Sequence, residues 1–265
     1  MKEILLEHIG FRKQILKLSK SELISAYKGA AFGPIWAIIK PATYIFVYWF
    51  AFYVGLRAGR DVRGAPFFLF LVVGLIPWFF MRDCISNGAA CFRSKKTLIT
   101  KMTFPISTIP TYTMLADLYV HVFLMVITYC ITMLYGIMPS VYNLQIFFYL
   151  PVMYLFFVFL SWITAPLSAI SKDFHNLVKS TIVALFWLSG ILWDANSLKH
   201  GLLKDIIMAT PITYFVNGYR DTFLYKKWFW ESPSELVFCF IWLAALGILG
   251  SFVYKKCRKI IPDVL

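Results

Sequence analysis

Long apolar stretches alternate with short charged connections along most of this 265-residue chain. A helix of about 20 apolar residues, rising 1.5 Å per residue, spans the roughly 30 Å hydrocarbon core of a bilayer. The stretches are too long for membrane strands and lack their period-two alternation, whereas a helix satisfies its own backbone hydrogen bonds in lipid. The pattern therefore predicts an all-α membrane protein with six transmembrane helices, at 34–56, 66–91, 113–137, 145–170, 177–193 and 236–254.

The distribution of Lys and Arg predicts the orientation of these helices. Hydrophobic residues make up 60% of the chain and charged residues 15%. The basic residues gather in the N-terminal segment, the second-to-third connection and the C-terminal tail. The positive-inside rule therefore places both termini in the cytoplasm. The net charge of +13 follows from this bias and from contact with anionic lipid, so it calls for no nucleic-acid partner.

The short loop after the first span departs from that rule. It holds Arg57, Arg60 and Arg63 on the predicted outer side. Guanidinium groups suit phosphate oxygens, so these three arginines are candidate contacts for phosphate groups outside the membrane.

Two segments outside the spans have patterns of their own. Residues 1–33 carry apolar residues at loosely helical spacing among Lys, Arg and Glu, which predicts a cytoplasmic amphipathic interface helix on the membrane surface. Residues 194–234 hold two apolar runs, 202–209 and 212–225, that are each too short to span. We expect a re-entrant helical hairpin in the outer leaflet, with an ordinary external loop as the alternative. The chain then divides into the interface helix and one transmembrane domain, 34–265.

Charged residues within the spans are costly in lipid and point to specific contacts. Counting 1.5 Å per residue, Arg82 on the second span and Asp117 on the third lie at similar depths on consecutive antiparallel helices. We therefore predict an Arg82–Asp117 ion pair, with a polar pathway through the membrane as the alternative. Lys40 lies near the inner end of its span, where its ammonium can snorkel to water, and is given no role.

Aromatic residues make up 19% of the chain, and many lie on the spans. Flat aromatic faces suit the C–H surfaces of sugar rings, whose hydroxyl groups stay in water. The candidates for the lining of a conduit are Tyr44, Tyr48, Phe52, Trp78, Phe186 and Trp187. The alternative is that these rings face lipid or form interfacial belts.

Motifs for catalysis are scarce in this sequence. It has no phosphate-binding loop of the G-x-x-x-x-G-K-[ST] type, so any use of ATP requires a separate subunit. The five cysteines predict neither a disulfide framework nor a metal site. His200 and Asp205 fit the H-x-x-x-x-D pattern of some acyltransferases, but the companion motifs are missing. We therefore expect a protein that is not an enzyme and that itself binds no cofactor or metal.

The connection between the second and third spans combines basic residues with apolar anchors. A short amphipathic cytoplasmic helix here would offer a partner protein both kinds of contact, and a solvated loop is the alternative. The docking candidates are Arg93, Lys95, Lys96, Leu98, Lys101, Met102 and Phe104.

Several short motifs, taken in their order along the spans, resemble one family. They are Tyr27-Lys-Gly-Ala-Ala-Phe-Gly-Pro-Ile-Trp36, Gly74-Leu-Ile-Pro-Trp-Phe-Phe80, Lys101-Met-Thr-Phe-Pro-Ile-Ser107, Ser171-Lys-Asp-Phe174, Thr210-Pro-Ile-Thr-Tyr214 and Gly218-Tyr-Arg220. Over nearly its whole length the chain resembles the ABC-2-type permeases of ABC exporters of cell-surface polysaccharides, and among them most closely the wall teichoic acid exporter permeases. It departs at Lys40-Pro41 and Thr210-Pro211, where the family often has Asn-Pro.

The resemblance implies partners, a location and a substrate. It implies a homodimer in the cytoplasmic membrane of a bacterium, bound to two copies of a cytoplasmic ATPase subunit that carry the ATP and Mg. Residues 11–27 and 94–105 would contact that ATPase, and 194–234 would be a re-entrant hairpin. The substrate would be a lipid-linked polymer, passed through an aromatic-lined channel between the two permeases.

These inferences converge on a membrane permease that exports a lipid-linked cell-surface polymer, of the teichoic acid or O-antigen type. An ABC permease for a smaller drug or lipid is one alternative. A membrane-embedded transferase is the other, and it would require an acid/base or metal site beyond the His200/Asp205 pattern.

Overall fold

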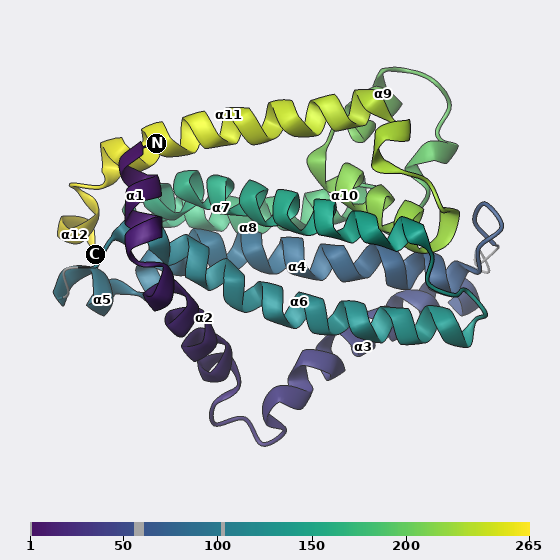
Figure 1. The fold of residues 1–265 in the computed structure, drawn as a ribbon, viewed down its shortest axis with the longest axis horizontal. Helices are drawn as coiled ribbons and strands as arrows, with labels where there is room; N and C mark the ends of the chain where they lie inside the picture. The colour runs from purple at the N-terminus through teal and green to yellow at the C-terminus, as the bar shows by residue number, and fades with distance from the viewer. Residues whose placement is uncertain (1, 56–60, 102–103) are drawn as a thin grey trace.

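A computed structural model of the chain describes residues 2–55, 61–101 and 104–265 (Figure 1). Long helices lie side by side along the molecule, and shorter helices cross their ends. The only paired extended residues in the described part of the chain are Val62 and Ala65, in one isolated bridge. The α-helices are α1 (Lys2–Gly10), α2 (Arg12–Tyr27), α3 (Trp36–Trp49), α4 (Phe67–Ser94), α5 (Lys96–Lys101), α6 (Ile109–Leu134), α7 (Ile146–Ile170), α8 (Lys172–Leu188), α9 (Leu202–Met208), α10 (Pro211–Arg220), α11 (Pro233–Cys257) and α12 (Ile261–Val264). The all-α prediction is confirmed.

Within the described residues, five helical segments are long and apolar enough to cross a membrane. They are Gly33–Gly55, Phe67–Ser94, Ile106–Leu134, Val141–Ile170 and Pro233–Cys257. The first of them extends α3 through a π-helical turn at Phe50–Gly55, and the third and fourth begin with 3-10 turns.

The fifth predicted span has different bounds in the structure, and its helix is not among the five segments. Its helix, α8, has 17 residues and ends at Leu188, whereas the sequence predicted 177–193. The helix begins earlier because the Ser171 hydroxyl caps it by accepting from the Phe174 N–H. It ends earlier because the backbone turns at Gly190, which has a φ of +64°. At 1.5 Å per residue α8 is about 26 Å long, so a full crossing by this helix is not confirmed.

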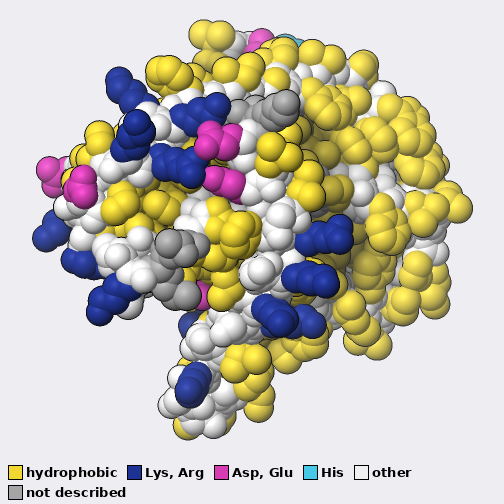
Figure 2. Space-filling view, turned by 60° about the vertical axis from the view of Figure 1, so that its left-hand side comes forward, with side chains coloured by type: hydrophobic (Ala, Val, Ile, Leu, Met, Phe, Trp, Pro, Cys, Tyr) yellow, Lys and Arg dark blue, Asp and Glu magenta, His cyan; other side chains and the backbone are white. Residues whose placement is uncertain are grey.

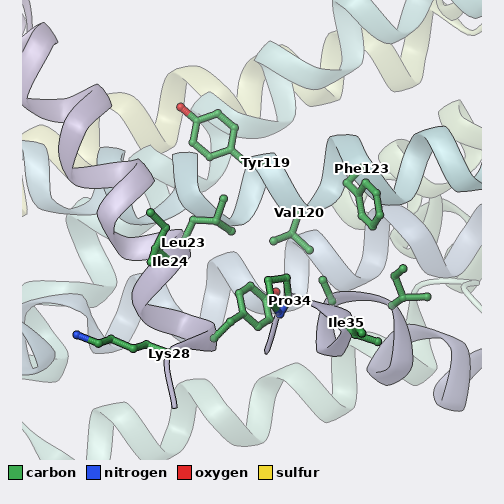
Figure 3. Close-up of a pocket in the computed structure, with 11 residues that line it drawn as sticks. Leu23, Ile24, Lys28, Pro34, Ile35, Tyr119, Val120 and Phe123 are labelled. Carbon is green, nitrogen blue, oxygen red and sulfur yellow. The ribbon is translucent and has the colours of Figure 1, made fainter. Parts of the chain in front are cut away.

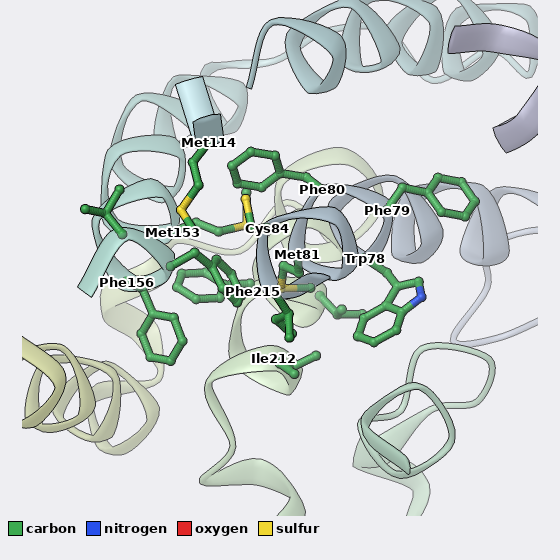
Figure 4. Packing of buried hydrophobic residues seen from close by; sticks show 14 of the residues in the cluster. Trp78, Phe79, Phe80, Met81, Cys84, Met114, Met153, Phe156, Ile212 and Phe215 are labelled. Atoms are coloured by element: carbon green, nitrogen blue, oxygen red, sulfur yellow. The ribbon is translucent and has the colours of Figure 1, made fainter. Parts of the chain in front are cut away.

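The core of the bundle is α4, most of whose residues are buried. It packs against α3, α6, α7, α8 and α10, and Figure 4 shows its side chains among those of the neighbouring helices. Met114 comes from α6, Met153 and Phe156 from α7, and Ile212 and Phe215 from α10. Because lipid tails are as apolar as these side chains, close packing rather than the exclusion of water holds such helices together.

Residues 194–234 contain two short helices, of which α9 is largely exposed and α10 is buried in the bundle. The turn between α9 and α10 lies beside α11, where the Trp242 indole donates to the Ala209 carbonyl at 3.2 Å. Trp242 lies nine residues after Pro233, so the turn reaches about 13 Å along α11. Phe215 packs edge-on against Phe156 of α7, with ring centroids 5.9 Å apart. The two predicted short helices are present, and their placement in a bilayer stays a prediction.

A buried arginine fixes this hairpin to the rest of the bundle. Arg220 is fully buried at the end of α10. Its guanidinium donates to the carbonyls of Gly190 at 2.8 Å, Ile191 at 2.6 Å and Phe70 at 3.4 Å. The guanidinium carbon also lies 3.5 Å from the centroid of the Phe70 ring. A buried cation is tolerated only when it is well hydrogen-bonded, and these contacts join α10, α4 and the turn after α8.

The approach of Arg220 to α4 requires glycine at position 74. A Cβ atom there would lie 2.5 Å from Nη2 of Arg220. We expect Gly74→Ala to displace the guanidinium and to lower the free energy of unfolding by about 1–3 kcal/mol, the usual cost of overpacking. The measurement is the midpoint of thermal unfolding of the purified chain in detergent.

Gly10→Ala is the matched control for this prediction, because no heavy atom lies within 4 Å of the new methyl group. Its midpoint should stay the same or rise slightly, since alanine favours the helix over glycine. Equal midpoints for the two variants would contradict the proposed role of Gly74.

Candidate functional site

Both chain termini lie at one end of the bundle, called here the terminal face. It is formed by α1, α2, α5 and α12, and α1 and α2 run across the long helices rather than along them (Figure 1). Figure 2 shows Lys and Arg side chains gathered toward this end, beside a surface that is largely hydrophobic. The predicted interface helix is present as two helices, which join at Phe11. On α1, Ile4 points into the core, whereas Leu5, Leu6 and Ile9 are exposed.

The two segments predicted to dock a partner contact each other on this face. The Lys95 ammonium lies 2.5 Å from the Glu22 carboxylate of α2. The rings of Phe11 and Phe104 meet edge-on, with centroids 5.7 Å apart. The described residues of 11–27 and 94–105 therefore adjoin on this face.

The seven predicted docking residues have different environments. Lys96 and Lys101 are exposed at the two ends of α5 and remain free to meet a partner. Lys95 is engaged by Glu22, and Arg93 donates to the Ala169 carbonyl at 3.4 Å. Met102 lies outside the described residues.

Leu98 and Phe104, predicted to be apolar anchors for a partner, are only partly available on this face, and contact with a partner stays a prediction for both. Both side chains are partly buried and pack against the chain's own core. Phe104 contacts Phe11 and the ring of Tyr112. The cause is that α5 follows α4 closely, so its apolar side turns back onto the bundle. The exposed large apolar groups of this face come from α1, α2 and α12 instead.

The terminal face also contains an ionic contact that the sequence analysis missed. Arg258, just after α11, lies 3.0 Å from the carboxylates of both Glu3 and Glu7 on α1. Partial burial lowers the pKa of Arg258, but neighbouring Tyr254, Glu7 and Glu3 outweigh it and raise the pKa above its usual value. The signal in the sequence was the presence of acidic residues within a strongly basic N-terminal segment.

Side chains link α1 to the start of α6 as well. The Ser107 hydroxyl donates to the Glu7 carboxylate, and His8 Nε2 lies 2.7 Å from the Thr111 hydroxyl oxygen. A displacement of α1 or α2 would therefore pull on the third span.

A polar cleft lies between α2, α3, α4 and α6. Its cavity has a volume of about 270 Å³, and its polar and charged lining includes Lys40, Arg82, Asp83, Asn87 and Asp117. These groups come from helices that the sequence assigns to the membrane, where uncompensated charge is costly. Such a group of side chains is a candidate binding site.

The predicted ion pair between Arg82 and Asp117 is not formed in this cleft. Arg82 pairs instead with Asp83 at 2.8 Å and lies over the rings of Tyr44 and Phe79. The amide of Asn87 donates to both carboxylate oxygens of Asp117 at 3.1 Å.

The reason is a difference in depth along the two helices. Because α4 extends to Ser94, Arg82 lies about 18 Å from its end and Asn87 about 10 Å. Asp117 lies about 12 Å from the start of α6 at Ile109, which is the depth of Asn87. Both charged groups line the same cleft, so the alternative of a polar site remains a prediction.

The predicted conduit aromatics divide into buried and exposed rings. Trp78 and Phe186 are buried within a single chain, with centroids 5.4 Å apart, and Tyr48 packs on Phe186 at 5.1 Å. Trp78 and Phe186 therefore line no open surface here, because they form the contact between α3, α4 and α8. Tyr44 and Trp187 are about half exposed, at 45% and 52%.

Phe52 is partly buried, with its ring centroid 6.2 Å from that of Phe67. For Tyr44, Tyr48, Phe52 and Trp187, a role in a conduit stays a prediction.

The outer-loop arginines can be placed only in part. Arg57 and Arg60 lie outside the described residues. Arg63 forms an ion pair with Asp194 at 3.4 Å, and its guanidinium lies 3.8 Å from the centroid of the Tyr225 ring. These contacts connect the loop to the 194–234 segment, and phosphate binding by Arg63 stays a prediction.

Comparisons with known proteins give a consistent result. A family model described as ABC-2 type transporter matches residues 13–224. The O-antigen export system permease protein RfbA of Myxococcus xanthus is 25% identical over 218 residues, which cover 80% of this chain and 81% of that protein. Two proteins of the same name from Klebsiella pneumoniae are 26% and 25% identical, each over 95% of this chain and 94% of their own length.

The contact between Lys95 and Glu22 can be tested by a double-mutant cycle. We expect Glu22→Gln and Lys95→Met, compared with the double variant, to give a coupling energy of about 0.5–1 kcal/mol, because the pair is partly exposed. The measurement is the free energy of unfolding of the purified chain. A cycle that combines Glu22→Gln with Lys96→Met serves as the control, since Lys96 is exposed, and its coupling should be near zero. Equal coupling in the two cycles would show that the Glu22–Lys95 contact is not specific.

Proposed function

The chain belongs to the ABC-2 type transporter family, and on that premise we propose that it is the membrane-spanning subunit of an ATP-driven exporter of a lipid-linked cell-surface polysaccharide. The observation that carries the proposal is the match, over nearly the whole chain, to proteins named O-antigen export system permeases. Those names favour a polysaccharide of the O-antigen type over the teichoic acid that the sequence motifs resemble.

The motor of such an exporter would be a separate protein. The sequence has no phosphate-binding loop, so ATP and Mg would be bound by a cytoplasmic ATPase subunit. We expect two copies of that subunit and a second copy of this chain. From the positive-inside count we expect the terminal face to lie in the cytoplasm, on the side where the ATPase would dock.

The contacts of the terminal face suggest how the ATPase would move the spans. A subunit bound at Lys96 and Lys101 would displace α5 when it closes on ATP. The Lys95–Glu22 ion pair and the Phe11–Phe104 contact would carry that displacement to α2. Because α3 follows α2 after a short connection, the first span would then shift. That shift would change the relative populations of the closed and open conformations of the exporter.

Charge reversal on α5 tests the docking surface. We expect Lys96→Glu combined with Lys101→Glu to reduce co-purification of the ATPase subunit at least fivefold, because both ammonium groups are exposed on the terminal face. Lys199→Glu with Lys227→Glu is the matched control, since it makes the same change in net charge at exposed positions of the connection after α8. Normal co-purification of the α5 variant would contradict docking at this helix.

Export itself can be tested in cells. In a strain from which the gene for this chain is deleted, we expect the surface polysaccharide to be lost and its lipid-linked precursor to accumulate inside, with both restored by the wild-type chain. The measurement is immunoblotting of polysaccharide from intact cells and from lysed cells. Unchanged surface polysaccharide in the deletion strain would overturn the proposed function.

A further inference from the structure

A second, apolar cavity adjoins the polar cleft. It has a volume of about 620 Å³, within the range of roughly 300–1,000 Å³ typical of ligand pockets. Figure 3 shows Leu23 and Ile24 of α2 on one side, Pro34 and Ile35 at the start of α3 on another, and Val120 and Phe123 of α6 behind them. The lining is almost entirely hydrocarbon, apart from Lys28 and the Tyr27 and Tyr119 hydroxyls.

The apolar cavity and the polar cleft share part of their lining. Tyr27, Ala37 and Val120 line both. A third cavity of about 270 Å³, which includes Asn87 and Asp117, also reaches Tyr27 and Val120. The three cavities adjoin at these shared residues, and we call them together the composite groove, apolar at one end and charged at the other.

The charged end contains groups that suit two kinds of ligand atom. The Lys40 ammonium is exposed and makes no ion pair within the described part of the chain, and it lies 6.0 Å from the Trp36 ring. With the Arg82 guanidinium it provides donors for a phosphate group. The carboxylates of Asp83 and Asp117 provide acceptors for hydroxyl groups.

Tyr27 lies where the apolar and charged ends meet. Burial raises the pKa of its phenol, and the negative charges of Asp83 and Asp117 raise the pKa further. The phenol therefore stays neutral and keeps its proton for a hydrogen bond. It is placed to donate to a ligand that passes from one end of the groove to the other.

We propose that the composite groove binds the membrane end of the exported molecule before transport: its hydrocarbon chain in the apolar cavity, its phosphate at Lys40 and Arg82, and the hydroxyls of its first sugar at Asp83 and Asp117. This assignment rests on the proposed function and names the site where that substrate is recognised. A lipid-linked saccharide has all three chemical parts in the same order as the groove, from hydrocarbon through phosphate to hydroxyl.

An ordinary phospholipid fits the groove less well. Its hydrocarbon and phosphate would be matched, but the two carboxylates would face the anionic headgroup without hydroxyl donors of a sugar. The phosphate groups of either lipid would be met by Lys40 and Arg82. The carboxylates favour the glycosylated lipid because the hydroxyl groups of its sugar can donate hydrogen bonds to them.

Site-specific photocrosslinking tests the assignment directly. Phe123 points into the apolar cavity (Figure 3), so Phe123→p-benzoylphenylalanine places a photoreactive group there. The complex with its ATPase subunit is reconstituted in nanodiscs that contain a polyisoprenyl diphosphate saccharide and an equal amount of phosphatidylglycerol. After irradiation, mass spectrometry identifies the adduct. We expect the saccharide-linked lipid to be the main adduct.

Two sets of variants sharpen this experiment. The first set is made in the photoreactive chain. We expect the double variant Lys40→Gln/Arg82→Gln to lower the yield of the saccharide-lipid adduct at least fivefold. Lys179→Gln, at an exposed position of α8, should leave that yield unchanged. Val122→p-benzoylphenylalanine is the positional control, because Val122 is 42% exposed and does not line the groove. It should give mainly phosphatidylglycerol adducts.

The outcomes separate this inference from the proposed function. Phosphatidylglycerol as the main adduct at position 123, or a crosslink to a second copy of the chain, would overturn the assignment of the groove. An unchanged adduct in the Lys40 and Arg82 variant would overturn the phosphate contact. Export of the polymer is measured with the wild-type complex in parallel, and failure there would count against the proposed function instead.

Discussion

The hydrogen bonds of one buried guanidinium hold the interior of this bundle together. Arg220 reaches three carbonyls that belong to α4 and to the turn after α8. The carbonyls of Gly190 and Ile191 are available because these residues lie in a turn beyond the end of α8. Without this cation, the carbonyls of Gly190 and Ile191 would lose these hydrogen bonds among apolar side chains, which is costly in lipid. The depth of the hairpin therefore depends on Arg220 and on the space left by Gly74.

The terminal face, at the opposite end of the molecule, is held by partly exposed ion pairs rather than by a buried cation such as Arg220. Arg258, Lys95 and their acidic partners on α1 and α2 are partly exposed, so each contact contributes little to stability. Contacts of this strength can break and reform during a working cycle. The contacts of Arg220 are thus buried and those of the terminal face partly exposed, and regions with few buried contacts are the ones that open most easily.

The sequence predicted the helices well because hydrophobic length is a local signal, but it predicted contacts poorly. The helix α8 ended early because the backbone turns at Gly190, which has a positive φ. The pattern of hydrophobic residues does not predict such a backbone angle. Asp117 met Asn87 rather than Arg82 because helix ends shift by a few residues, and each residue changes depth by about 1.5 Å. Leu98 faced inward because the direction of a short helix depends on its neighbours. The basic terminal face, by contrast, follows from charge counting alone and was predicted correctly as a place where basic residues gather.

The same reasoning explains why the composite groove could not be found from the sequence. From the sequence, Lys40 is expected to snorkel from its own helix, and Asp117 is expected to pair with Arg82. These residues belong to one candidate site only because the chain bends between α2 and α3. This elbow brings Tyr27 beside Val120, so that the apolar cavity adjoins the charged cleft. The elbow arises where Gly29 and Gly33 adopt positive φ values, so that α2 and α3 diverge instead of forming one helix. Two glycines thus create a groove whose chemistry is supplied by residues far apart in the chain.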